Sequence, residues 1–85
     1  MPLTSEQCRA ARALLDWTQD DLAAHAEVSR STVRGFEGRQ HGLQRATAAA
    51  IRRALEIAGV IFLDADADCG PGVRLCRTPR PETEG

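Results

Sequence analysis

The sequence predicts a small, mainly α-helical domain of four short helices, with a short β extension near its C-terminal end. The chain has 85 residues, which is the size of one small domain. Apolar residues recur at helical spacing through the first two thirds of the chain, and a Ser or Thr that can cap a helix begins three of the segments. After residue 59 the pattern changes to short β-prone runs.

The first helix is predicted over residues 5–15. Thr4 and Gln7 form a capping box, because the Thr4 side chain can accept from the first turn while Gln7 reaches back to the Thr4 backbone. Cys8 and Ala11 follow at helical spacing on the predicted apolar face. We interpret the Cys8 thiol as a small core residue.

Two further short helices are separated by a tight turn. Thr18 can cap the second, which carries two aspartates in its first turn and extends to about Ala26. Ser29 can cap the third, which is predicted over residues 30–37 with Gly38 directly after it. The turn places the apolar Val28 where it can fill the angle between the two helices. This pattern is the sequence form of a helix-turn-helix.

A fourth helix is predicted from about residue 45 to residue 58, with Gly59 as its stop. Residues 60–63 are β-prone, residues 73–77 alternate between apolar and polar, and Gly-Pro-Gly at 70–72 turns the chain between them.

The predicted organisation is a helix-turn-helix domain over residues 1–59, a β extension over residues 60–77 and a flexible tail over residues 78–85. An isolated two-stranded hairpin is marginal in water. The strands therefore need cover, either from helices of the same chain or from a second copy. We favour a homodimer built through these strands.

The charge is distributed unevenly along the chain. The net charge is −1 and all eleven cations are arginines. Residues 29–53 nevertheless contain six arginines against Glu37 alone, and are flanked by acidic segments on both sides. A basic middle segment indicates a polyanionic partner in spite of the small net charge.

Several other classes of protein are disfavoured. No nucleophile, base and orienting group form a recognisable set, so we expect neither an enzyme nor a cofactor. The acidic run at 64–68 resembles the start of a calcium loop, but Gly70 comes one place late and Leu75 stands where glutamate is needed, so we expect no metal. We expect no membrane association and a cytoplasmic location, because there is no long apolar run or signal pattern and the three cysteines lack metal-ligand spacing.

Three short motifs carry a family resemblance over about residues 8–58. They are Thr18-Gln19-x-x-Leu22-Ala23, Val28-Ser29-x-x-Thr32-Val33 and Phe36-Glu37. In this order and spacing they resemble the XRE (lambdoid repressor and Cro-like) helix-turn-helix family of small bacterial or phage transcriptional regulators. The resemblance implies a four-helix lambda-repressor-like domain that binds double-stranded DNA. It also implies a structural ion pair between Arg12 and Glu37.

The third helix would read the DNA bases. Recognition helices contact base edges with their N-terminal residues, and the fork of an arginine fits guanine. Arg30 and Arg34 share one face because they are four residues apart. The predicted base contacts are Arg30, Ser31 and Arg34, and the predicted backbone contacts, in part from the resemblance, are Gln19, Thr32, Arg39 and Arg45.

Four details qualify this site. Gly35 supplies no side chain at a position that the family often uses for a base contact. Of two interpretations of His41, a weak DNA contact and an ordinary loop residue, we favour the second. Glu27 stands where the family commonly has a left-handed glycine, so a looser or differently shaped turn is expected. Gly38 comes one residue earlier than in the family pattern, which affects the reach of Arg39.

The resulting functional hypothesis is a sequence-specific DNA-binding transcriptional regulator, with repression as the favoured activity. The alternative is a protein-interaction module, such as an antitoxin or anti-activator, that binds a partner protein through residues 60–77.

Overall fold

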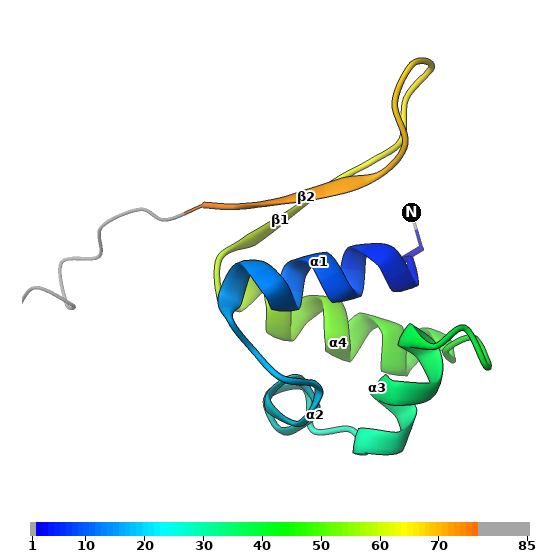
Figure 1. Ribbon diagram of the computed structural model, residues 1–85, viewed down its shortest axis with the longest axis vertical. Helices are drawn as coiled ribbons and strands as arrows, with labels where there is room; N and C mark the ends of the chain where they lie inside the picture. Colours follow the sequence, from blue (N-terminus) through cyan, green and yellow to red (C-terminus); the bar gives the residue numbers. More distant parts are fainter. Residues whose placement is uncertain (1, 77–85) are drawn as a thin grey trace, which may run out of the picture.

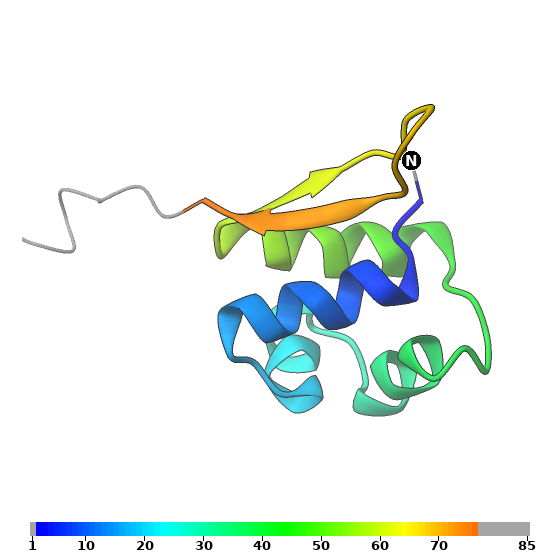
Figure 2. The same cartoon turned by 45° about the horizontal axis from the view of Figure 1, so that its top comes forward.

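The computed structural model describes residues 2–76 and is mainly helical. Its elements are α1 (Ser5–Leu15), α2 (Gln19–Ala26), α3 (Arg30–Glu37), α4 (Arg45–Ile57), β1 (Val60–Leu63) and β2 (Gly72–Leu75). The hairpin of β1 and β2 lies on one side of α1 and α4, and α2 and α3 lie on the other side (Figures 1 and 2). The predicted fold class is confirmed. The predicted tail, residues 78–85, falls outside the described residues.

The core is small and is assembled from every helix. Its largest fully buried side chains are Leu22, Val33, Ile51, Leu55 and Cys8. Val60 of β1 is also buried, so the hairpin closes the core on the side away from α2 and α3. The prediction that Cys8 is a core residue is confirmed.

The helix starts follow the predicted caps. Thr4 and Thr18 each form a complete capping box, with Gln7 and Asp21 as the reciprocal partners. The Ser29 side chain accepts from the backbone N–H of Thr32. Each cap satisfies backbone donors that the first turn of a helix leaves without a partner.

The helix ends differ from expectation, because three of them use a left-handed residue that is not glycine. Asp16, Glu27 and Arg39 have φ values of 61°, 60° and 61°. Prediction placed the third stop at Gly38, which has a φ of −82°. The left-handed residue is Arg39, one position later. Its conformation turns the chain back so that the Gln40 N–H donates to the Gly35 carbonyl at 2.8 Å. This is a Schellman motif. At the end of α4 the predicted stop, Gly59, does have a positive φ, of 114°.

The two strands pair with each other in an antiparallel ladder, with Val60 opposite Leu75 and Phe62 opposite Val73. The second strand begins and ends earlier than its predicted range, because Leu63 pairs with Gly72 at the end next to the loop. Intrachain pairing is one of the two arrangements that the sequence left open. The paired strands also pack on α1 and α4, so the helices of the same chain cover them.

Gln7 joins α1 to this hairpin, a role that the sequence did not indicate. Its side chain is buried; its Oε1 accepts from the Thr4 N–H, while its Nε2 donates to the carbonyls of Leu63 at 3.4 Å and Gly72 at 3.1 Å. One amide therefore caps the helix and holds the end of the strand pair.

Candidate nucleic-acid interface

The α2–turn–α3 unit is a tight helix-turn-helix. The Val28 N–H donates to the Ala23 carbonyl at 3.0 Å, and the Glu27 N–H donates to the Ala24 carbonyl at 3.3 Å. The expectation of a looser or differently shaped turn is therefore wrong, because the turn is tight and Glu27 takes the left-handed conformation. Glu27 adopts a left-handed conformation that glycine adopts more readily, because two hydrogen bonds and the half-buried Val28 hold the turn in place.

A buried network fixes the orientation of α3. The carboxylate of Glu37, at the end of α3, accepts from Arg12 Nη2 at 2.6 Å, from Arg12 Nε at 2.8 Å, and from both the Cys8 thiol and the Gln19 amide at 3.0 Å. Arg12 Nη1 also donates to the Trp17 carbonyl at 3.0 Å. The predicted Arg12–Glu37 pair is confirmed, and it connects α1, α2 and α3.

The charges in this network are set by opposing effects. Burial raises the pKa of Glu37, but hydrogen bonds from Arg12, Cys8 and Gln19 together with the arginine charge outweigh it and leave that pKa below its usual value. Burial and the hydrogen bond to Glu37 raise the pKa of Cys8, which keeps the thiol protonated as a donor. The Glu37 charge is thus neutralised inside the domain.

The three predicted base-contact residues lie on the outer face of α3. Arg30, Ser31 and Arg34 are all exposed, whereas Val33 and Phe36 of the same helix are buried. Within the described part of the chain, Arg34 makes no ion pair or hydrogen bond through its side chain. Since Glu37 is buried and paired, the exposed face of α3 carries only positive charge.

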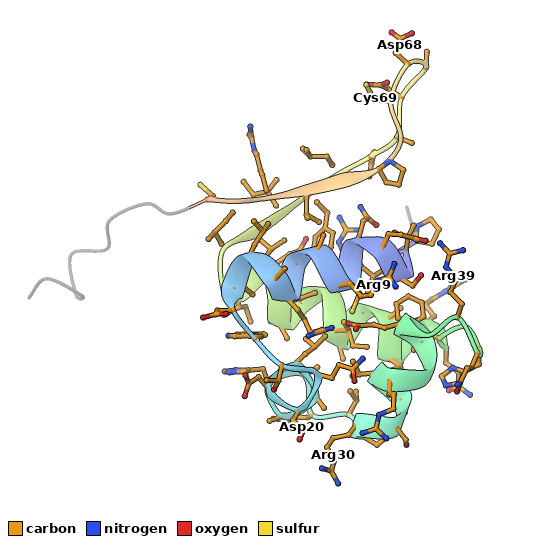
Figure 3. All side chains as sticks on the ribbon, viewed as in Figure 1. Arg9, Asp20, Arg30, Arg39, Asp68 and Cys69 are labelled. Atoms are coloured by element: carbon orange, nitrogen blue, oxygen red, sulfur yellow. The ribbon has the colours of Figure 1, made fainter. Side chains whose placement is uncertain are left out.

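Arg30 has a partner that the sequence analysis did not anticipate. Its Nη1 lies 3.4 Å from Oδ2 of Asp20, in the first turn of α2, and Figure 3 shows both at the end of the molecule away from the hairpin. The two side chains are 67% and 59% exposed, so the ion pair is weak and easily exchanged for another partner.

The predicted backbone-contact residues are more dispersed. Gln19 is committed to Glu37, and Thr32 shares a 2.7 Å hydrogen bond with the Ser29 hydroxyl. Arg39 forms an ion pair with Glu6 of α1. Arg45, at the start of α4, lines a groove of about 560 Å³ with residues that include Leu3, Leu43 and Arg52. The structure thus brings Arg30, Ser31 and Arg34 together on one face and gives Gln19, Thr32 and Arg39 intramolecular partners.

His41 lies in the loop after α3, as expected, and makes a contact with α3 that the sequence did not indicate. Gly35 is buried, and the nearest atoms around its missing side chain all belong to the His41 ring. One feature of the sequence could have indicated this contact: a glycine on the outer face of the helix, Gly35, is followed by an aromatic residue, His41, in the next loop.

The acidic residues of the loop between the strands lie away from α3. Asp64, Asp66 and Asp68 belong to the loop between the strands, and Figure 3 shows Asp68 at the opposite end of the molecule from Arg30. Hydrogen bonds from the backbone N–H groups of Asp68 and Cys69 lower the pKa of Asp66. Over residues 2–76, no three His, Cys, Asp or Glu side chains are grouped to hold a metal ion.

None of the helices in the described part of the chain is long and apolar enough to cross a membrane. No known protein-family model matches this chain, and no curated protein sequence is significantly similar to it.

Proposed function

We propose that this protein is a sequence-specific DNA-binding transcriptional regulator that inserts α3 into the major groove and acts as a repressor. The observation that carries the proposal is the exposed face of α3. Two arginines and a serine project from a helix whose inner face is fixed by the buried Arg12–Glu37 pair. A rigid element that presents arginine forks is the arrangement that reads guanine edges.

The dimensions support this use of α3. An α-helix with its side chains is about 10–12 Å in diameter, and the major groove is about 12 Å wide and admits a helix. In this pose Arg30 exchanges its weak contact with Asp20 for a DNA partner. Helix-turn-helix proteins commonly bind two half-sites as dimers, and we extend the proposal to a homodimer.

The test begins with selection of a preferred duplex from a random pool, followed by binding titrations. Arg34→Ala is expected to weaken binding to the selected duplex about tenfold, the lower part of the range for an arginine–guanine contact. Unfolding stability should change by less than about 0.5 kcal/mol, because Arg34 is exposed and has no side-chain partner to lose among residues 2–76.

The matched control is Arg74→Ala. Arg74 is an exposed arginine of β2, on the side of α1 and α4 opposite α3. The Arg74→Ala substitution removes the same charge as Arg34→Ala and should leave the selected duplex bound as tightly as before. Affinity for DNA should also fall steeply with salt through counterion release. Equal binding of the wild-type protein to selected and scrambled duplexes would contradict the proposal.

Exposed apolar residues favour a second candidate, a protein-interaction module such as an antitoxin or anti-activator. Ile57 is 72% exposed and Leu63 is 42% exposed. Because side chains alternate along a strand, Ile61 and Leu63 share the face of β1 opposite Val60 and Phe62. A partner bound through residues 60–77 would cover this face; Arg77 lies outside the described residues.

This candidate is tested with Leu63→Ser rather than by deleting the extension, because deletion would uncover Val60 and open the core. Light scattering of the purified protein reports a homodimer, and light scattering of mixtures with the products of neighbouring genes reports a different protein partner. Leu63→Ser should abolish either association. A wild-type protein that stays monomeric in both experiments would contradict this candidate and the strand-mediated homodimer.

A further inference from the structure

We propose that His41, a loop residue, is a base-contacting residue of the reading face and supplies the side chain that Gly35 of α3 lacks. This inference rests on the proposed DNA-binding function and deepens it. It assigns a specificity-determining role to a pair of residues that lie on two different segments.

The position of Gly35 on α3 is the first step. Successive residues of an α-helix are separated by about 100°, so residue 35 lies one turn after Ser31 on the same stripe. Val33, Phe36 and Glu37 occupy the inner side of the helix and are buried in the domain. Gly35 therefore belongs to the outer stripe, between exposed neighbours, and yet it is buried.

The cover over Gly35 is the imidazole of His41. A Cβ atom built on Gly35 would lie 2.2 Å from Nε2 and 2.7 Å from Cδ2 of His41, and no other residue contributes its nearest atoms. These separations are far below van der Waals contact. Only glycine at position 35 leaves room for the ring, so the glycine and the histidine form one unit on the surface of α3.

The loop holds the ring in this place. The left-handed Arg39 reverses the chain, and the Gln40 N–H donates to the Gly35 carbonyl at 2.8 Å. His41 Nδ1 lies 2.8 Å from the Gly42 carbonyl. A carbonyl can only accept, so Nδ1 carries a hydrogen in this arrangement. The ring is thus positioned before any ligand arrives.

The chemistry of this unit suits a base edge. His41 is exposed to solvent although its ring rests on the helix. The ring covers Gly35, which is on the same side of α3 as Ser31 and next to Arg34. A duplex that contacts the side chains of Ser31 and Arg34 would therefore also contact the imidazole. The ring supplies hydrogen-bonding nitrogens and a flat surface that can pack against a thymine methyl group.

The experiment is a thermodynamic cycle on the full chain with the duplex that the wild-type protein selects. His41→Ala is expected to weaken binding to this duplex about tenfold. Gly35→Ala should have a similar effect, because its methyl group displaces the ring. The double variant should bind no worse than His41→Ala alone, since the second change then has nothing left to displace.

A second selection from a random pool identifies the base. With His41→Ala, the preference should be lost at one base-pair position and kept at the others. Thermal unfolding serves as the readout of a merely structural role: Gly35→Ala adds a helix-favouring residue and should not lower the unfolding midpoint.

Two results would overturn the inference. One is wild-type affinity and selectivity in both single variants. The other is an equal loss on selected and random duplexes, which would make His41 a phosphate contact without sequence information. A wild-type protein that selects no duplex overturns the proposed function itself, and that result is obtained before any variant is compared.

Discussion

Glu27 stores strain at the turn between α2 and α3. Its φ of 60° is a conformation that a side chain disfavours by about 1–2 kcal/mol and glycine does not. Glu27→Gly is therefore expected to raise the free energy of unfolding by about 1 kcal/mol, after allowance for the greater freedom of glycine in the unfolded chain. Urea denaturation measures this change.

Glu27→Ala is the matched control, because it removes the carboxylate but keeps the strained Cβ. It should not reproduce the gain in stability. An equal gain from both substitutions would assign the effect to the charge of Glu27 rather than to its backbone conformation.

Residue-scale predictions from the sequence worked best where the physics is local. Thr4, Thr18 and Ser29 were identified as caps because a cap and its partners lie within one helical turn. The left-handed helix ends could not be predicted in this way. Such ends are normally recognised by a glycine, and Asp16 and Arg39 occupy these positions instead.

The site was predicted unevenly for the same reason. Arg30, Ser31 and Arg34 were placed on the outer face correctly, because the period of a helix determines the face. The intramolecular partner of Gln19 was missed because Glu37 lies eighteen positions away. The contact between His41 and Gly35 was not predicted, because it depends on how the loop reverses after α3.

At the scale of the elements, the buried Glu37 charge makes the attachment of α3 sensitive to acid. The pKa of Glu37 is lower in the folded protein than its ordinary value of 4.5. Its contribution to stability is fully present above pH 4.5 or so and is lost as the pH falls through the lowered folded value. Asp21 and Asp66, whose pKa values are also lowered, add to the same trend.

We therefore expect unfolding free energy to decrease below about pH 4.5, and the Glu37 carboxyl to titrate at a lower pH than the ordinary value. Carbon-13 NMR of the labelled carboxyl measures the second quantity directly. A Glu37 midpoint at or above 4.5 would show that burial, rather than the hydrogen bonds from Arg12, Cys8 and Gln19, dominates.

Gln7 offers a separate test of how α1 holds the hairpin. Gln7→Glu keeps an acceptor for the Thr4 N–H and so preserves the capping box. It replaces the donor to the Leu63 and Gly72 carbonyls with an oxygen, in a buried site. A buried carboxylate without a donor costs more than a neutral group in the same place, so we expect a loss of at least about 2 kcal/mol and faster amide exchange in β1 and β2.

Gln40→Glu, the same change at an exposed position, serves as the control and should alter stability by less than about 0.5 kcal/mol. Exchange that accelerates equally in α2 and the strands would indicate global destabilisation rather than release of the hairpin.

For the whole molecule, under the proposed function, the position of each charge matters more than the net charge of −1. Figure 3 shows Asp68, at the tip of the acidic loop, and Arg30 at opposite ends of the protein. Screening limits the reach of an exposed charge to about 8 Å at physiological salt and extends it to about 30 Å at 0.01 M. The hairpin thus carries negative charge where it does not oppose a polyanion bound at α3.

Under the proposed function, Asp20→Asn should strengthen DNA binding more than Asp64→Asn, Asp66→Asn and Asp68→Asn combined, although it removes one charge instead of three. Asp20 lies beside Arg30, and its removal both frees that arginine and takes a negative charge away from the nearest phosphates.

Titrations at 0.15 M salt should show a several-fold gain for Asp20→Asn and almost none for the triple variant. At 0.01 M salt the triple variant should begin to gain, since its charges are then no longer screened. A triple variant that gains as much as Asp20→Asn at 0.15 M would place the DNA close to the hairpin, and α3 would then not be the reading element.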